Sequence, residues 1–239
     1  MSNVHRRRRV VAILVIAIVP AFLLIQQLFL QPKTEPGDSV SKNTIQKIDT
    51  DKPLAINELE KLSVKNRVSK NGYKRAEFGN GWARWNKCDT RQKILSRDLV
   101  DIIFDDDKCT VLSGTLNDPY TGEIISFTRG KSTSNAVQID HVVALSNAWQ
   151  TGAQLLDRDT RIAMANDDLE LIAVQGKANQ QKSDRDASEW LPSNIAFRCQ
   201  YVARQIAVKI KYALWVTQNE YDAIKRVLNT CPNQYLPSP

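Results

Sequence analysis

The feature that most limits how this chain can fold is an apolar run at positions 10–30, which follows four consecutive arginines at positions 6–9. A run of about 20 apolar residues is long enough to span a bilayer. Basic residues before the run, and none immediately after it, place the N-terminus in the cytoplasm by the positive-inside rule. We therefore expect residues 1–9 to form a cytoplasmic basic N-terminus and residues 10–30 to form a transmembrane signal anchor. The alternative is a cleaved signal peptide whose apolar core is residues 10–24. Both interpretations place the remaining chain outside the cytoplasm, at the cell membrane or secreted.

The rest of the chain divides into a linker and one candidate domain. Residues 31–52 are polar, with two prolines, a glycine and scattered lysines and aspartates, which is typical of a flexible tether. Residues 53–239 then form an extracytoplasmic domain of ordinary size. The net charge of +7 is concentrated at the start, because residues 1–30 hold four arginines and no acid, and the remainder carries only +3. This weak basic bias is compatible with a polyanionic partner without establishing one.

Four cysteines, Cys88, Cys109, Cys199 and Cys231, are expected to form two disulfides. They contain no Cys-x-x-Cys pair, which disfavours a structural zinc site. An even number of cysteines in an oxidising compartment predicts disulfides instead. Three pairings are open, and the preferred one joins nearest neighbours, Cys88 to Cys109 and Cys199 to Cys231. Each bond would contribute about 3–4 kcal/mol in the chain-entropy model. Four free buried thiols are the alternative.

Apolar periodicity and turn chemistry predict an α+β fold, in which a few short strands are embedded in a mostly helical domain. Asp89 or Thr90 is expected to cap a helix that runs to about Phe104. The acidic run at residues 105–107 is expected to be a solvated loop, and turn residues at 117–122 separate two predicted strands. The expected strands are residues 109–112, 123–128, 137–143 and 169–174, and the other expected helices are residues 54–64, 144–152, 159–165, 175–182, 194–214 and 217–228.

The predicted domain contains a single histidine, His141, which follows Asp140 at the end of a predicted strand. Phosphodiester hydrolysis needs a base that deprotonates water and a cation that stabilises charge on the phosphate. An imidazole suits the first role because its unperturbed pKa is about 6.5, and side-chain oxygens of Asp140 and Asn179 suit a magnesium ion. Adjacent strand residues point to opposite faces, so a bulge or a strand end must aim Asp140 and His141 at one phosphate. The alternative is a buried histidine beside a surface aspartate.

Longer segments around these residues resemble the HNH endonucleases, the ββα-metal group, and most closely the exported branch related to the C-terminal domain of GmrSD restriction enzymes. The resemblance covers about residues 70–231, which makes it much more specific than an Asp-His pair alone. It implies a ββα-metal core within the helical domain. The matching segments are residues 139–145, 165–174 and 179–186, with shorter matches at 78–79, 88–91, 118–122, 152–153 and 189–192.

The resemblance also implies a role for each candidate site residue. His141 is the general base that activates water, and Asp140 and Asn179 hold one divalent ion, Mg²⁺ first and Mn²⁺ as an alternative. Lys182, about one helical turn after Asn179, is a candidate phosphate contact, with a solvated surface lysine as the alternative. Arg91 is a second candidate phosphate contact, with a structural ion pair as the alternative.

The middle position of the H-N-H pattern departs from the family. Members usually have an asparagine just before the apolar run of the second strand, where this chain has Glu170. Asn166 lies four residues earlier and is the other candidate for the middle role. In the family, this middle residue mainly organises the loop and the base.

The sequence therefore predicts a metal-dependent endonuclease of DNA, with RNA as a second substrate, that acts outside the cytoplasm. Contacts with the phosphate backbone would make cleavage non-specific and salt-sensitive, and the resemblance implies products with a 5′-phosphate and a 3′-hydroxyl. No obligate protein partner is expected. The alternative is a catalytically inactive exported envelope protein that binds its partner through the same scaffold, and Glu170 is the feature in its favour. A Ser-His-Asp hydrolase is disfavoured because no Gly-x-Ser-x-Gly motif occurs.

Overall fold

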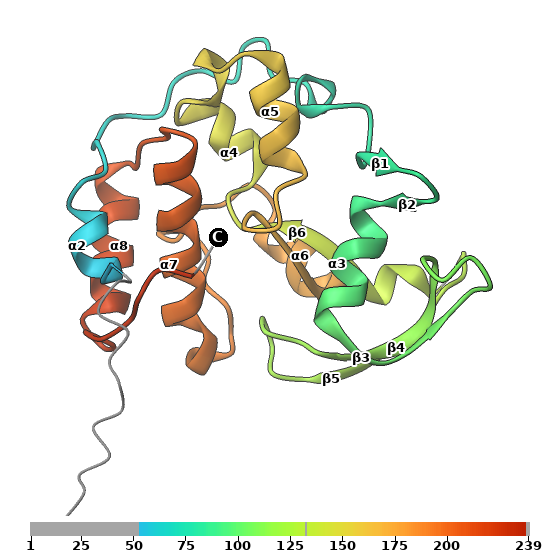
Figure 1. The fold of residues 1–239 in the computed structure, drawn as a ribbon. Helices are drawn as coiled ribbons and strands as arrows, with labels where there is room; N and C mark the ends of the chain where they lie inside the picture. Colours follow the sequence, from blue (N-terminus) through green and yellow to red (C-terminus); the bar gives the residue numbers. More distant parts are fainter. Residues whose placement is uncertain (1–52, 132, 238–239) are drawn as a thin grey trace, which may run out of the picture. The chain divides into compact units, whose positions relative to one another are not determined.

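The computed structural model describes residues 53–131 and 133–237 of the chain (Figure 1). The predicted basic N-terminus, signal anchor and tether all fall outside these residues. Within the part that the structure describes, none of the helices is both long enough and apolar enough to cross a bilayer.

One part of the domain is built from helices around a common core (Figure 1). Leu59, Tyr201, Ile206 and Ile224 have no exposed surface and represent this core. The last helix starts at a regular cap, because the Thr217 side chain accepts a backbone hydrogen bond from its first turn. The helices are α2 (Ala55–Leu59), α4 (Leu145–Gln150), α5 (Arg158–Ala165), α7 (Arg198–Lys211) and α8 (Gln218–Leu228).

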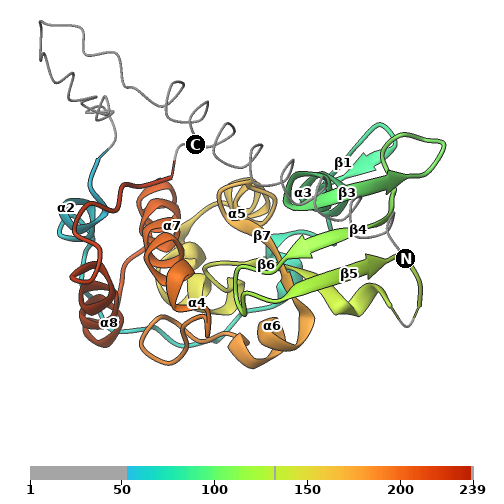
Figure 2. The ribbon, with the colours of Figure 1, turned by 90° about the horizontal axis from the view of Figure 1, so that it is seen from below.

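A three-stranded antiparallel sheet and one helix enclose a second core (Figures 1 and 2). The strands are ordered β3-β4-β5, and α3 covers one face of the sheet by packing Ile94 and Leu95 against Leu116 and Phe127. The side chain of Asp89 caps α3 as expected, because it accepts a hydrogen bond from the backbone N–H of Gln92. These elements are α3 (Thr90–Asp98), β3 (Leu99–Phe104), β4 (Val111–Asn117) and β5 (Ile124–Thr128).

A two-stranded antiparallel ribbon followed by a helix lies between the two cores. β6 (Val137–His141) pairs with β7 (Leu171–Gln175), and α6 (Gly176–Lys182) follows β7 directly. Ile139 and Leu171 of the ribbon belong to the sheet-side core, whereas Ile172 and Val174 belong to the helical core. Both faces of the ribbon are therefore buried. The remaining short elements are η1 (Arg75–Phe78), β1 (Arg84–Trp85), β2 (Cys88–Asp89), η2 (Ser134–Ala136), η3 (Ala153–Leu155) and η4 (Ile195–Phe197).

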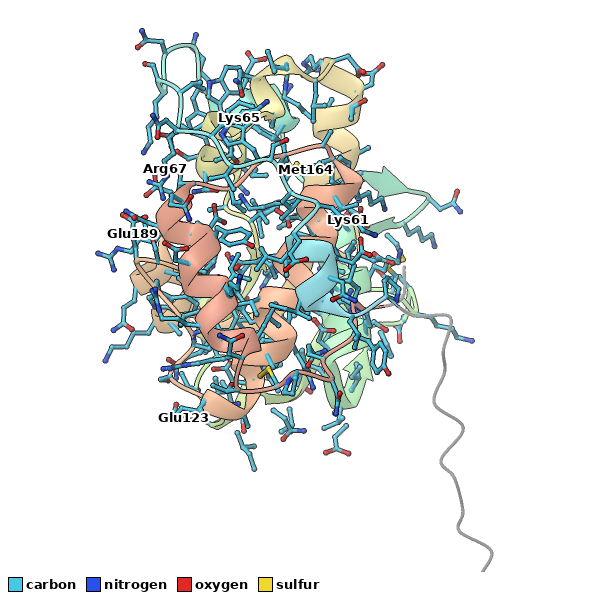
Figure 3. All side chains as sticks on the ribbon, turned by 90° about the vertical axis from the view of Figure 1, so that its left-hand side faces the viewer. Lys61, Lys65, Arg67, Glu123, Met164 and Glu189 are labelled. Carbon is cyan, nitrogen blue, oxygen red and sulfur yellow. A yellow bond between two sulfur atoms is a disulfide. The ribbon has the colours of Figure 1, made fainter. Side chains whose placement is uncertain are left out.

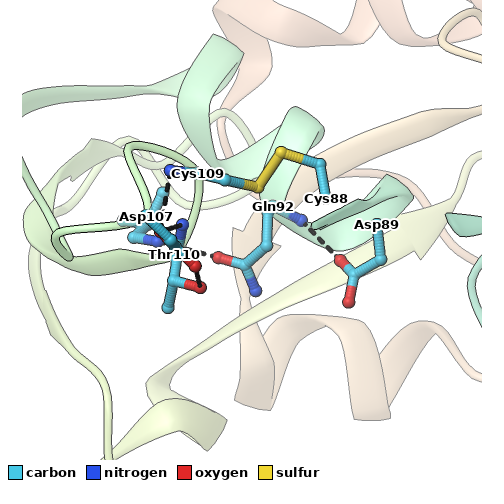
Figure 4. Close-up of a disulfide and its surroundings, with 7 residues drawn as sticks. Cys88, Asp89, Gln92, Asp107, Cys109 and Thr110 are labelled. Atoms are coloured by element: carbon cyan, nitrogen blue, oxygen red, sulfur yellow. Dashed lines mark hydrogen bonds between the residues drawn. A yellow bond between two sulfur atoms is a disulfide. The ribbon is translucent and has the colours of Figure 1, made fainter. Parts of the chain in front are cut away.

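The mixture of helices and strands confirms the predicted α+β content, and both disulfides join the nearest neighbours in sequence. Cys88 pairs with Cys109 and Cys199 with Cys231, at Cα–Cα distances of 5.7 and 6.4 Å. The first bond ties the start of α3 to the loop between β3 and β4 (Figure 4). Asp107 closes this loop, since its carboxylate accepts hydrogen bonds from the backbone N–H groups of Cys109 and Thr110.

The helix predicted to run from Thr90 to about Phe104 is wrong in its second half. α3 ends at Asp98, and Leu99–Phe104 forms β3. This segment contains several β-branched residues, which favour a strand, and it pairs with β4 through a ladder that contains register shifts. Asp101, with a φ of 52°, lies in the irregular part of the ladder. The pairing partner lies in another segment, so the apolar spacing of the helix could not reveal where the strand begins.

An extended segment after α2 crosses to the loop that follows α6. Arg67 in this segment donates hydrogen bonds to Asp186 at 2.5 Å and to Glu189 at 2.7 Å. Arg67 and Glu189 are labelled in Figure 3. Asp186 is 2% exposed, so the ion pair between Arg67 and Asp186 is shielded from solvent on its acidic side, whereas Glu189 is exposed. The contact fixes the chain that leads into η1 and towards the candidate site.

Candidate active site

A pocket of about 520 Å³ opens beside the ribbon and collects most of the residues that the sequence singled out. His141, Asp140, Asn179 and Arg91 all line it, whereas Lys182 does not. The complete lining is Arg75, Trp82, Arg91, Asn135, Gln138, Ile139, Asp140, His141, Ala144, Leu145, Asn179, Gln180 and Ser183.

The pocket follows the last residues of β6, and this explains how neighbouring strand residues reach one cavity. Asp140 pairs across the ribbon with Ile172 on the helical-core side, and His141 pairs with Leu171 on the sheet side. Their side chains therefore leave opposite faces, as expected for a strand. β6 pairs with β7 along one edge only and ends at His141. Residues on both faces can therefore border the same space at the strand end.

The imidazole of His141 is held in one orientation. Its Nε2 lies 3.0 Å from the backbone carbonyl oxygen of Ala165. A carbonyl only accepts, so Nε2 carries the proton in the neutral ring and Nδ1 keeps the free lone pair. The ring stacks on Trp82 at a centroid distance of 5.7 Å. His141 is only 6% exposed, and burial lowers its pKa to about 3, with the positive charges of Arg75 and Lys182 acting in the same direction. The ring is therefore a neutral base at physiological pH.

Asn166 fixes the carbonyl that orients this ring. It ends α5 directly after Ala165. Its Oδ1 accepts hydrogen bonds from the Ala83 N–H at 2.8 Å and the Thr90 hydroxyl at 2.7 Å, and its Nδ2 donates to the Ile162 carbonyl at 2.9 Å. Asn166 does not line the pocket. It acts on the site by holding the backbone beside the base.

Glu170, the other candidate for the middle position, is fully buried away from the pocket. Its Oε2 accepts a hydrogen bond from the Val143 N–H at 3.2 Å, and its backbone carbonyl accepts one from the Val142 N–H at 2.9 Å. Oε1 is buried and has no hydrogen-bond partner among the residues that the structure describes. Burial raises the pKa of Glu170 well above its ordinary value. Glu170 therefore fixes the chain that leaves His141 and is favoured in its neutral form.

Two buried side chains bind the carboxylate of Asp140. The Tyr120 hydroxyl donates to Oδ2 at 2.5 Å, and the Lys182 ammonium lies 3.1 Å from Oδ1 and 3.0 Å from Oδ2. Lys182 has no exposed surface and also donates to the His141 carbonyl at 2.8 Å. Burial raises the pKa of Asp140, while Lys182 and Tyr120 oppose that rise. The structure thus places Lys182 beneath the site, as the counter-ion of Asp140, and not at the pocket surface.

Two oxygen atoms remain suited to a hard cation. Among the described side chains, only Lys182 donates a hydrogen bond to Oδ1 of Asp140. The amide of Asn179 donates through Nδ2 to Gln138 at 2.9 Å, and no hydrogen bond within the described residues engages its Oδ1. Carboxylate and amide oxygens are ordinary Mg²⁺ ligands, and this ion commonly keeps water and substrate oxygens in its shell. The described ranges contain no group of three or more His, Cys, Asp or Glu residues that could hold a metal. The two oxygen atoms therefore suit an ion that takes few ligands from the protein and the others from water or substrate.

Two arginines give the pocket its positive charge. Arg91, on the first turn of α3, donates to the backbone carbonyl of Val137 at 3.1 Å, and burial lowers its pKa. Arg75 comes from η1 and was not singled out from the sequence. No motif or spacing marks it, because the segment that carries it meets β6 only in the tertiary structure. Tyr120, in the turn between β4 and β5, also reaches the site and donates a hydrogen bond to Asp140.

Comparison with known proteins assigns the domain to a family. The protein-family model described as "GmrSD restriction endonucleases, C-terminal domain" matches residues 89–227. The chain belongs to this family. This GmrSD-type C-terminal domain is also similar to an "Uncharacterized secreted protein" of Arthroderma benhamiae, with 35% identity over 175 residues, which cover 72% of this chain and 82% of the relative. No solved structure matches the chain. The family membership confirms the resemblance to the GmrSD branch and indicates a nuclease-type domain.

Proposed function

We propose that this protein is an exported, metal-dependent endonuclease of the HNH type, which hydrolyses phosphodiester bonds of DNA and, as a second substrate, RNA. Membership of a restriction endonuclease family supports the reaction class, and similarity to a protein described as secreted supports a location outside the cytoplasm. The order β6, β7, α6 supports the ββα-metal assignment, with His141 at the end of the first strand and Asn179 in the helix.

The observation that carries the proposal is a neutral imidazole with a fixed tautomer at the edge of a pocket that Asp140 and Asn179 also line. Nδ1 of His141 accepts a proton from the attacking water, and the Ala165 carbonyl stabilises the positive ring that results. Water attacks phosphorus as the bond to the 3′ oxygen breaks, and the leaving oxygen takes up a proton from solvent, which leaves a 5′-phosphate and a 3′-hydroxyl. Asp140 and Asn179 would hold one Mg²⁺ or Mn²⁺ ion, which when bound stabilises negative charge on the phosphate and the leaving oxygen.

The contacts of Lys182 suggest a different role from the phosphate contact first expected. Its ammonium is fully buried against Asp140 and the His141 carbonyl, so in this role it holds the strand end in position. Arg91 remains the candidate phosphate contact, because its guanidinium lines the pocket and binds only backbone carbonyls there. Recognition through phosphates alone gives non-specific and salt-sensitive cleavage.

Plasmid cleavage tests the proposal. The oxidised protein is incubated with supercoiled plasmid and Mg²⁺ or Mn²⁺, with a chelator and the His141→Ala variant as controls. We expect nicked and linear DNA from the wild type and none with either control. Urea unfolding of His141→Ala establishes that loss of activity is not loss of folding. Activity that survives the substitution, or an intact plasmid with every divalent metal tried, contradicts the proposal.

A second candidate is an exported binding protein without catalytic activity. One observation in its favour is that Lys182 and Tyr120 already bind the buried carboxylate of Asp140, which leaves little room for an ion to bind the same carboxylate. The other is Glu170, which occupies the middle position of the motif. A gel-shift assay with the same plasmid distinguishes the two candidate functions. Retarded but uncut DNA in a gel-shift assay indicates the binding protein.

A further inference from the structure

Arg75 presents a positive charge to the pocket without a partner to neutralise it. It lines the cavity together with His141, its side chain is exposed, and no hydrogen bond or ion pair holds it within residues 53–131 and 133–237. It lies near enough to the imidazole for its charge to lower the pKa of His141. Arg75 precedes residue 89, where the match to the family begins.

The backbone that carries Arg75 is fixed by its neighbours. Phe78, at the end of the same 3₁₀ turn, is 2% exposed and belongs to the helical core. Glu77 binds Arg161 through both its backbone carbonyl, at 3.2 Å, and its carboxylate, at 3.0 Å. Asn166 holds the Ala83 N–H further along the segment. The backbone of the turn is thus fixed on α5 while the guanidinium group stays free to bind. Because the backbone is already ordered, binding a ligand costs less conformational entropy.

The charges around the pocket leave an excess of positive charge. Asp140 is the one acidic residue among the described side chains that line it, and Lys182 already neutralises that carboxylate. Arg75 and Arg91 then remain as two guanidinium groups without a carboxylate partner in the lining. An arginine fork matches the paired oxygens of a phosphate diester.

We infer that Arg75 contacts the scissile phosphate and stabilises the charge that develops on it during attack. The inference rests on the proposed nuclease function and adds a substrate-contacting residue from the segment before the matched domain. Trp82, which follows on the same segment, stacks on the base from one side. The segment that carries Arg75 and Trp82 therefore forms one wall of the site.

The test compares Arg75→Ala and Arg75→Lys with the control Lys74→Ala. Lys74 is the adjacent exposed cation and does not line the pocket. Cleavage kinetics are measured on plasmid with Mg²⁺ or Mn²⁺. Binding of a fluorescein-labelled 12-nucleotide single-stranded DNA is measured by anisotropy at several salt concentrations, with each substitution placed in the His141→Ala background so that the probe stays intact. Urea unfolding checks that each variant is folded.

We expect Arg75→Ala to lower kcat by about 10²–10³-fold, the usual effect of losing one preorganised donor to transition-state charge. Arg75→Lys keeps the charge but loses the fork, so its activity should be intermediate. In the binding assay, Arg75→Ala should reduce the slope of log affinity against log salt by about 0.7, which corresponds to one lost phosphate contact on a single strand. Lys74→Ala should match the unsubstituted protein in both assays.

Two results overturn the inference. If the wild type cleaves and Arg75→Ala matches Lys74→Ala in kcat and in salt dependence, Arg75 does not contact the phosphate although the nuclease proposal stands. If Arg75→Ala changes only KM, the residue attracts the polyanion without acting on the transition state.

A third result separates the inference from the nuclease proposal. If the wild type cuts no DNA while Arg75→Ala still weakens binding and flattens the salt dependence, the contact with phosphate is supported and the nuclease proposal fails.

Discussion

Replacing Lys182 with methionine isolates the buried ion pair beneath the candidate site. Methionine keeps most of the apolar stem but removes the ammonium that binds both oxygens of Asp140 and the His141 carbonyl. Lys182 is 0% and Asp140 6% exposed, so water cannot replace the lost charge without opening the structure. Breaking a buried pair by removing one partner typically costs about 3–5 kcal/mol. We expect this loss in the free energy of unfolding.

Urea unfolding followed by tryptophan fluorescence measures the loss. With an m-value of about 2 kcal/mol per M, the midpoint should fall by about 1.5–2.5 M. The control is Lys177→Met, an exposed lysine on the same helix, which should change stability by no more than about 0.5 kcal/mol. Adding Asp140→Asn to Lys182→Met removes both charges and should restore part of the stability, since the cost comes from the unpaired carboxylate.

The loss should also depend on pH in a definite direction. Burial already raises the pKa of Asp140, and Lys182 opposes that rise, so removing Lys182 should raise the pKa in the folded state further. An acid with a higher pKa in the folded state binds its proton more tightly when folded. The penalty therefore vanishes below the unfolded-state pKa of about 3.9 and is complete above the folded-state pKa. The deficit of Lys182→Met should thus shrink as pH falls. A midpoint equal to that of Lys177→Met at neutral pH would refute the buried-pair reasoning.

Changes at three further sites test other parts of the fold by the same unfolding assay. Glu170→Gln should be nearly neutral, because the carboxyl is favoured in its protonated form, whereas Glu170→Ala removes the acceptor of a buried N–H and should cost about 1–3 kcal/mol. Gly176→Ala should cost at least about 1–3 kcal/mol, because an added Cβ would lie 2.0 Å from the backbone oxygen of Asn135. Replacing Cys199 and Cys231 together with alanine removes a cross-link between positions 32 residues apart and should cost about 3–4 kcal/mol.

Each of these expectations has a result that contradicts it. Equal losses for the glutamine and alanine variants at position 170 would mean that the carboxyl is ionised in the folded protein. Wild-type stability of Gly176→Ala would mean that η2 and the start of α6 separate at little cost. If the double cysteine variant unfolds at the same urea concentration as the wild type, the bond that closes α7 onto the end of α8 does not restrict the unfolded chain.

The sequence predicted the local parts of the fold well, because their signals are contained in short segments. Asp89 caps α3, and Asp118 forms the turn before β5 by accepting hydrogen bonds from Thr121, both from side chains next to the backbone they hold. The disulfide pairing followed from proximity along the chain. The end of α3 was wrong, because the strand that replaces the expected helix depends on β4 for its partner.

Most of the candidate site was also accessible from the sequence, since residue types and the resemblance to the GmrSD branch together indicated His141, Asp140, Asn179 and Arg91, and one pocket collects all four. The spacing of Lys182 from Asn179 placed it one turn further along a helix. It could not tell whether that turn faces solvent or the interior, and the structure buries it.

What the sequence alone determined was therefore the set of chemical groups and the local structure around each: the lone imidazole of the domain, the candidate oxygen ligands, the caps, the turns and the cysteine pairs. The tertiary structure decided which groups face one another. It paired Lys182 with Asp140, aimed the Ala165 carbonyl at His141 and brought Arg75 to the pocket wall. These contacts join segments that are far apart along the chain, and burial sets their energies and pKa values, so no local pattern of residues could encode them.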